Sequence, residues 1–440
     1  MTDAAAGAGF TPARPQLIRT MNEQLLLNQI RQLGICSRAD LARLSGLSKP
    51  TVSLALANVE RSGLVRTAGQ RTGVPGRSAV LYEIRPEAGY VLGLDIGHEY
   101  LRGAITDLTG EIRAKAEARC PATSVSKRVS ELVRLADGIC SAAGVTRAEV
   151  TQTVLGSPGV YDPRRDAITL TGGMAGWDRP AVLAGLRGAF GENLAVENDT
   201  DAAALAEREH GHGREFTSFV FVSIGTGIGM GLVLGGQLHR GAHGVAGEIA
   251  FLPITEGPGD VADDEVRRRG ALEAVGSAAA IVRAARRAGL RTQSARQVFA
   301  AAAAGDERAV AIVAAEARLV AKAICAIVAV VDPGLVVLGG GIGQAPGFAA
   351  AVRTDLGRIA PVLPDIRVSA LGTSAVVDGC LASGADLAWG RLTAQLAQAQ
   401  ADQLPAAADG DRGGRGDRGD RGGRASEGSQ GGQMVALPAT

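Results

Sequence analysis

The 440-residue sequence predicts an α/β protein, with a small N-terminal winged helix-turn-helix, a larger two-lobed α/β domain and a disordered C-terminal tail. Three observations predict this fold class. Apolar residues recur with helical spacing over 37–64, strands alternate with helices over 90–391, and a Gly-, Arg- and Asp-rich segment follows. We place the winged helix-turn-helix at 16–85 and the large domain at 88–391, with disordered segments at 1–15 and 394–440.

The winged helix-turn-helix is predicted from residues 37–64, SRADLARLSGLSKPTVSLALANVERSGL. Gly46 suits the tight turn between two helices, and Ser48 is a good N-cap for the second, which we expect to run to about Glu60. One buried stripe of this helix follows from Val52, Leu56 and Val59. An earlier helix over Met21–Leu33 and a two-stranded wing around Gly69–Gly76 complete the motif.

Charge is distributed as a nucleic-acid-binding module would require. Residues 1–84 carry ten Lys/Arg and five Asp/Glu, a net charge of +5 on a chain whose total is +1. Helix-turn-helix proteins place the start of the second helix in the major groove, and a wing Arg commonly reaches the minor groove. We therefore predict that DNA is contacted by Arg38, Ser48, Lys49, Thr51, Ser53 and Arg77. An ordinary solvated basic face is the alternative.

Composition excludes several classes of protein. The five cysteines are scattered without a Cys-x-x-Cys pair, which argues against a disulfide scaffold and a zinc ribbon. The most apolar stretch, Ala321–Val331, is too short to span a bilayer, and residues 1–16 do not resemble a signal peptide. We expect a cytoplasmic protein with no membrane partner.

The large domain reads as alternating strands and helices. We expect a meander from Tyr90 with a turn at Asp107–Gly110. Further strands are expected at Thr153–Gly159, Leu194–Glu197, Phe219–Ile224, Gly231–Leu234 and Leu335–Leu338, and helices at Ser126–Ala143, Asp201–His210 and within Leu272–Val331. Lobe one is assigned to about 88–198 plus 375–391, and lobe two to about 199–374.

Three glycine turns follow strands in this domain. Glycine after a strand lets backbone amides approach a phosphate closely. The turns contain Asp95 and Gly97, then Gly225, Thr226 and Gly227, then Gly340 and Gly341. Their order, with an Asp ending the first strand, matches the actin-like ATPase and sugar-kinase fold. The third turn lacks the acidic residue of a dinucleotide site, so an NAD-binding protein is rejected.

Between the first two turns lies Glu197-Asn198-Asp199. An Asp in a closing cleft can act as general base on a hydroxyl, and Asn198 beside it can hydrogen-bond neighbouring hydroxyls. The alternative is that the pair only forms a turn and caps the helix that follows.

These residues resemble the ROK family of repressors and sugar kinases over about residues 16–391. Supporting matches are Leu155-Gly156-Ser157-Pro158-Gly159, Gly176-Trp177, Asn198-Asp199, Gly247-Glu248 and Gly270-Ala271-Leu272-Glu273. The resemblance implies a sugar site formed by Gly159, Asn198, Asp199, Glu248 and Glu273, with Asp199 catalytic if the protein is a kinase.

Two departures from the family pattern bear on cofactors. Family kinases continue the first phosphate loop as Asp-x-Gly-Gly-Thr, whereas this chain has His98-Glu99 after Gly97, which places a negative charge near the γ-phosphate. The family's zinc-binding His and Cys residues are also missing, since the run after Glu248 is Ile-Ala-Phe. We therefore predict no zinc, with ATP and magnesium used only if kinase activity survives.

We predict a DNA-binding transcriptional regulator, of the repressor type, whose large domain senses a sugar or sugar derivative. Its partners would be a double-stranded operator, a small-molecule sugar effector and other copies of itself in a homodimer or homotetramer. One alternative is an ATP-dependent sugar kinase with a DNA-binding arm. Another is an architectural DNA-binding protein whose large domain only dimerises.

Overall fold

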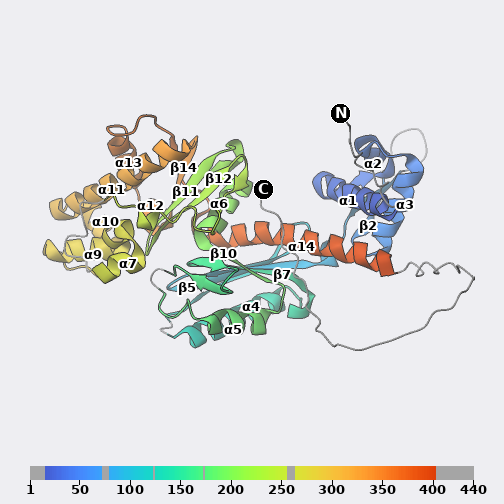
Figure 1. Ribbon diagram of the computed structural model, residues 1–440, viewed down its shortest axis with the longest axis horizontal. Coiled ribbons are helices and arrows are strands. Elements are labelled where there is room, and N and C mark those ends of the chain that lie inside the picture. The colour runs from blue at the N-terminus through green and yellow to red at the C-terminus, as the bar shows by residue number, and fades with distance from the viewer. Residues whose placement is uncertain (1–14, 72–78, 122–123, 172–173, 255–262, 403–440) are drawn as a thin grey trace, which may run out of the picture. The chain divides into compact units, whose positions relative to one another are not determined.

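The computed structural model describes residues 15–71, 79–121, 124–171, 174–254 and 263–402 (Figure 1). Its N-terminal module is a winged helix whose small sheet has the strand order β1-β3-β2. The elements are α1 (Pro15–Leu33), β1 (Cys36–Ser37), α2 (Arg38–Ser45), α3 (Lys49–Arg61), β2 (Val65–Arg71) and β3 (Ala79–Ile84). The predicted winged helix-turn-helix is confirmed, and its first helix begins at Pro15 rather than Met21.

Local sequence explains where α2 and α3 begin and end. Ser37 and Asp40 form a capping box at the start of α2, and Gly46 ends that helix with a φ of 70°, which glycine adopts easily. Ser48 caps α3 by accepting a hydrogen bond from the backbone N–H of Thr51. The buried face of α3 consists of Val52, Ala55, Leu56 and Val59.

Lobe one of the large domain is built on a five-stranded sheet with the order β10-β7-β4-β5-β6. Its strands are β4 (Tyr90–Ile96), β5 (Tyr100–Asp107), β6 (Ile112–Arg119), β7 (Val150–Ser157) and β10 (Leu194–Asn198). A separate small hairpin of β8 (Val160–Asp162) and β9 (Ala167–Thr169) lies between β7 and β10 in the chain. The helices α4 (Val125–Ala142) and α5 (Pro180–Phe190) lie on one side of this sheet and α14 (Ala375–Asp402) on the other (Figure 1). Short 3₁₀ turns occur at Pro86–Ala88 and Arg147–Glu149.

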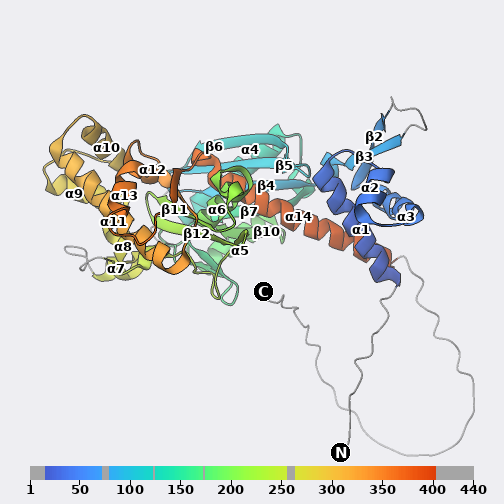
Figure 2. The ribbon, with the colours of Figure 1, turned by 90° about the horizontal axis from the view of Figure 1, so that it is seen from above.

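Lobe two has a second five-stranded sheet, with the order β13-β12-β11-β14-β15. Its strands are β11 (Phe219–Ile224), β12 (Ile228–Leu234), β13 (Gln237–Leu238), β14 (Leu335–Gly339) and β15 (Asp365–Val368). Its helices are α6 (Asp199–His210), α7 (Asp263–Arg269), α8 (Ala271–Gly276), α9 (Ala278–Arg287), α10 (Ala295–Ala303), α11 (Glu307–Val331), α12 (Gly340–Gly343) and α13 (Phe348–Leu356), with 3₁₀ turns at His212–Glu215, Ile249–Phe251 and Gly372–Ser374. Figure 2 shows α9, α10, α11 and α13 gathered in this lobe.

Each lobe has an aliphatic core of its own, as expected from a chain with 3% aromatic residues. One forms between the lobe-two sheet and α9, α10, α11 and α13, and the other between the lobe-one sheet and α4 and α5. A third cluster joins the buried side chains of the winged helix to Trp389 and Leu396 of α14. Within the described residues, no helix is long and apolar enough to cross a membrane.

The boundary predicted for the disordered tail was wrong by several residues. Helix α14 continues through 394–402, the segment that the sequence assigned to the tail. Leu396 is buried in the cluster shared with the winged helix, so packing extends the helix beyond the point where its Gln- and Ala-rich sequence suggested an end. The segment 403–440 and residues 1–14 lie outside the described residues, so the prediction of disorder there stays a prediction.

Candidate functional site

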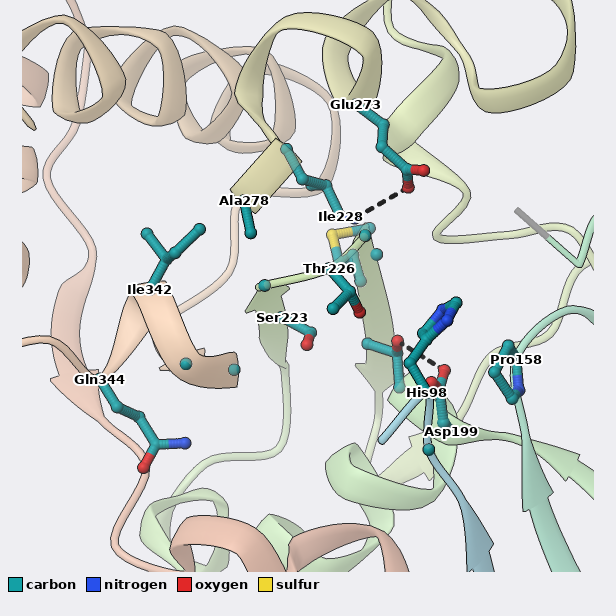
Figure 3. A pocket seen from close by; sticks show the side chains of 18 of the residues that line it. His98, Pro158, Asp199, Ser223, Thr226, Ile228, Glu273, Ala278, Ile342 and Gln344 are labelled. Atoms are coloured by element: carbon teal, nitrogen blue, oxygen red, sulfur yellow. Dashed lines mark hydrogen bonds between the residues drawn. The ribbon is translucent and has the colours of Figure 1, made fainter. Parts of the chain in front are cut away.

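A cavity of about 940 Å³ is lined by residues of both lobes. Lobe one contributes the β4–β5 turn and the loop after β7, and lobe two contributes the β11–β12 turn, the start of α6, α10 and the loop after β14. Figure 3 shows His98, Asp199, Thr226 and Glu273 around this space. The cavity therefore brings together the three glycine turns and the sugar-binding residues predicted from the sequence, apart from Asp95, which lies buried behind it.

Asn198 caps α6, one of the two roles that the sequence left as alternatives, and it also lines the cavity. Its Oδ1 caps α6 by accepting hydrogen bonds from the backbone N–H groups of Thr200 (2.9 Å) and Asp201 (3.1 Å). Its Nδ2 donates to the carbonyl of Gly159 at 3.1 Å. An amide nitrogen has two hydrogens, so one of them is left for a ligand in the cavity.

Gly159 cannot be replaced without moving the loop that it forms. Its φ is +90°, and a Cβ placed on it would lie 2.4 Å from the carbonyl oxygen of Thr169. A buried hydrogen bond also holds the start of this loop, because Trp177 donates its indole N–H to Ser157 Oγ at 2.8 Å. The Gly-Trp and Ser-Pro-Gly segments noted in the sequence thus support each other at this wall of the cavity.

Asp199 and Glu248 are the acidic groups best placed to meet a ligand. Burial raises the pKa of Asp199 to about 6, offset in part by a hydrogen bond from Thr200 Oγ1 at 3.2 Å. Burial, with the charges of Asp199 and Glu273, raises the pKa of Glu248 to about 7. Among the described residues, the Glu248 carboxylate has no hydrogen-bond or ion-pair partner. Both groups can accept hydrogen bonds from ligand hydroxyls.

Glu273 lines the cavity but is already partly engaged. One carboxylate oxygen accepts the backbone N–H of Ile228 at 3.0 Å (Figure 3). The other lies 3.5 Å from Arg269 Nη1. A Cβ on Gly227 would come within 2.8 Å of this carboxylate. Glu273 therefore positions the β11–β12 turn, a role that the sequence did not predict for it.

The second and third glycine turns meet at the lobe-two side of the cavity. Gly225, Thr226 and Gly227 form the hairpin turn between the antiparallel strands β11 and β12, as expected. Gly340 has a φ of +74°, and a Cβ there would lie 2.3 Å from the carbonyl oxygen of Ile224. The place where a Cβ of Gly225 would stand is 3.6 Å from the amide nitrogen of Gly341, so the two turns are in contact.

The first glycine turn does not fit a magnesium-bound triphosphate. Asp95 is buried at the end of β4, and Arg102 from β5 approaches its carboxylate at 3.3 Å. The pKa of Asp95 rises to about 7 through burial and the charge of Asp199, against the opposing effect of Arg102. Glu99 in the turn pairs with Arg119 at 2.9 Å, a partner that the sequence did not predict for it. A carboxylate that already pairs with an arginine is less available to a magnesium ion. A glutamate in the same turn disfavours a phosphate chain, because both are negatively charged.

Two further charged residues near Asn198 and Asp199 were not predicted from the sequence. Arg240, in the loop after β13, forms a two-point ion pair with Glu197 at the end of β10. Asp201 in the first turn of α6 lines the cavity, and its pKa rises to about 8 through burial and the charge of Glu197. The repeated Asp in Asp199-Thr200-Asp201 was a signal from which Asp201 could have been predicted. Nothing local in the sequence marks Arg240.

Of the predicted DNA-contacting residues, four lie on α3 or at its N-cap, and Arg38 begins α2. Lys49 and Ser53 are on α3, where Lys49 is exposed. The hydroxyls of Ser48 and Thr51 lie 2.8 Å apart and are occupied by the helix cap. Arg38 hydrogen-bonds to the hydroxyl of Tyr82 and stacks on its ring at 5.3 Å. Arg77 lies outside the described residues.

The absence of zinc stays a prediction. Residues 255–262, between the two segments that match the family's metal-binding region, lie outside the described residues. Within the described residues, no group of three or more His, Cys, Asp or Glu side chains is placed to hold a metal ion.

Comparison with known proteins identifies the family. The ROK family model matches residues 91–384, and the chain belongs to this family. It is 31% identical to the ROK hexokinase of Thermus thermophilus, with a TM-score of 0.56 over 67% of this chain and 97% of that one. A ROK family transcriptional regulator, described as a homologue of the E. coli MLC protein, covers 87% of this chain and 99% of its own at 24% identity and a TM-score of 0.68.

A curated relative, the xylose repressor of Bacillus spizizenii, is 26% identical over 237 residues. That match covers 54% of this chain, and the chain spans 61% of the length of the repressor.

Proposed function

We propose that this protein is a DNA-binding transcriptional repressor whose ROK domain binds a sugar. The observation that carries the proposal is a complete, capped helix-turn-helix with an outward face on α3, in the same chain as a cavity lined by Asn198, Asp199 and Glu248. Support also comes from the xylose repressor among its relatives and from the fold match to a regulator, which extends over more of the chain than the hexokinase match.

We infer a monosaccharide as the effector, with D-xylose as the first compound to test. Asn198, Asp199 and Glu248 offer an amide donor and two carboxylates on one side of the cavity, a set suited to several adjacent hydroxyls. The relative named a xylose repressor supports the choice of compound. The sign of the response, induction or co-repression, follows from whether the sugar lowers or raises DNA affinity.

Helix α14 is the route by which we propose that the sugar site acts on the DNA-binding module. A Cβ on Gly379 would lie 1.7 Å from the carbonyl of Ala202 in α6, the helix that begins at Asp199. Farther along α14, Asp386 pairs with Arg31 of α1 at 2.9 Å, and the Arg31 guanidinium lies 5.7 Å from the Trp389 ring centroid. Closure of the two lobes around a ligand would displace α14 where it contacts α6, and the displacement would reach its contact with α1.

The test combines operator selection with ligand titration. Full-length protein is used to enrich sequences from random duplexes, and affinity for the enriched duplex is measured with and without D-xylose and a panel of other monosaccharides. We expect one sugar to change operator affinity at least about fivefold, a typical allosteric coupling. Asp199→Asn should abolish that response without changing affinity in the absence of sugar. An operator affinity unchanged by every sugar that binds would contradict the proposal.

A second candidate function, an ATP-dependent sugar kinase, is favoured by one observation. Asp199 lies in the cavity with a pKa of about 6, which suits a general base for a sugar hydroxyl near neutral pH. The Asp95–Arg102 pair and Glu99 oppose it. A coupled phosphorylation assay with ATP and magnesium distinguishes the two functions, since kinase turnover should disappear in Asp199→Asn.

A further inference from the structure

Leu54 is an unusual residue for the exposed side of α3. Val52, Ala55, Leu56 and Val59 of this helix are buried, as expected for the face that packs on α1 and α2. Leu54 is 53% exposed. Pro50 is also exposed and precedes Leu54 by four residues, so the two share one helix face. Pro50 and Leu54 thus form an apolar strip on the outward side of α3.

Some polar side chains of α3, among them Thr51 and Asn58, form hydrogen bonds within the module itself. The hydroxyls of Ser48 and Thr51 serve the N-cap. Toward the other end of the helix, Asn58 donates from Nδ2 to Glu23 at 2.7 Å, and its Oδ1 accepts from Arg61 at 2.9 Å. Bidentate reading of adenine by an Asn, a common device in the major groove, is therefore not open to Asn58 without breaking these bonds.

We propose that Leu54 is a specificity-determining residue that contacts the C5-methyl group of thymine in the major groove, an inference that rests on the proposed DNA-binding function. The N-terminal half of a recognition helix faces base edges, and Leu54 lies one turn after the residues at its start. Thymine is the base that offers an apolar group there, and apolar side chains recognise it by contact. Lys49, exposed at the first position of α3, would position the module on the phosphates.

The chemistry makes a selective test available, because uracil differs from thymine only by the missing methyl group. An operator is first enriched from random duplexes with full-length protein, and each thymine of the half-site is then replaced by uracil. For the unmodified protein, we expect uracil at one or two positions to weaken binding about fourfold per contacted methyl. Leu54→Ala should weaken binding to the thymine operator similarly and should not distinguish uracil from thymine at those positions.

The matched control is Leu25→Ala on α1, since Leu25 is 39% exposed and lies outside the helix-turn-helix. This variant should keep the full thymine preference. A Leu54→Ala protein that still discriminates thymine from uracil at every position overturns the assignment, and so does an unmodified protein that shows no discrimination while binding its operator tightly. Failure to enrich any sequence would instead refute the DNA-binding function and the inference with it. Circular dichroism melting curves establish that both variants are folded.

Discussion

Arg240 and Glu197 form an ion pair that joins the two lobes beside the cavity. Glu197 ends β10 of lobe one, directly before Asn198-Asp199, and Arg240 follows β13 of lobe two. The loop that Arg240 opens ends at Glu248, and a Cβ on its Gly244 would lie 3.0 Å from Val160 of lobe one. The pair therefore fixes a loop that carries a ligand-facing carboxylate.

Replacing Arg240 should loosen this loop. In Arg240→Gln we expect amide hydrogen exchange over residues 241–248 to accelerate about tenfold, equivalent to about 1.4 kcal/mol of lost local stability. Hydrogen-exchange mass spectrometry measures the change. The double variant Glu197→Arg/Arg240→Glu should restore slow exchange, and Arg134→Gln, which removes an exposed ion pair on α4, is the control. Equal exchange in the unmodified and Arg240→Gln proteins would show that the pair does not hold the loop.

Sugar affinity should depend on pH through Asp199 and Glu248. Their pKa values are raised to about 6 and about 7, so both are increasingly protonated below neutral pH. Ionised carboxylates accept hydrogen bonds from hydroxyls more strongly than neutral carboxyls do. We expect affinity for the sugar found in the panel to rise between pH 5.5 and pH 8, by calorimetric titration, and Asp199→Asn to bind more weakly with a shallower pH dependence. An affinity that falls over this range would contradict the assignment.

Glu316 on α11 should limit stability at high pH. It is 4% exposed, burial raises its pKa to about 8, and among the described residues its Oε1 has no hydrogen-bond partner. Because the folded-state pKa lies above the unfolded-state value, its ionisation destabilises the fold progressively from about pH 4.5 to pH 8.

Glu316→Gln should therefore match the unmodified protein in stability near pH 4.5 and exceed it by at least about 1 kcal/mol at pH 8.5. Urea denaturation at several pH values tests this. Glu307→Gln, at the exposed start of the same helix, serves as the control and should show little pH-dependent difference. A gain from Glu316→Gln that is independent of pH would mean that ionisation of Glu316 is not the cause.

Two glycines of α14 provide a test of its packing against α6. A Cβ on Gly379 would lie 1.7 Å from the backbone carbonyl oxygen of Ala202, whereas a Cβ on Gly390 would meet nothing within 4 Å. Gly379→Ala should destabilise the protein by about 2 kcal/mol or more, since backbone must move. Gly390→Ala should be neutral or stabilise by up to about 1 kcal/mol through helix propensity. Similar thermal denaturation midpoints for the two variants would contradict the close contact.

The local elements could be predicted because their signals are local. Gly46, Ser48 and the stripe of Val52, Leu56 and Val59 define α3 within fourteen consecutive residues, and the structure differs from the prediction by one residue at the end of the helix. Glycine turns after strands were visible for the same reason, and the cavity brings these turns together with Asn198-Asp199.

The partners of charged side chains could not be predicted in this way. Arg102 with Asp95 joins adjacent strands, Arg240 with Glu197 joins different sheets, and the exposed Arg38 bonds to Tyr82. Each pairing depends on which segments fold next to each other, so a linear pattern carries no record of it.

The sequence by itself determined the order of the domains, the helix-turn-helix and the residue types that line the cavity, since periodicity, caps and glycine turns act over a few residues. Only the tertiary structure decided which of those residues are free to meet a ligand. Glu248 is left unpaired among the described residues while Glu273 is taken by the Ile228 amide, and Leu54 is left on the outside of α3. The physical reason is that hydrogen bonds and burial are shared among segments far apart in the chain, so the donors and acceptors that the fold uses are not left for a ligand.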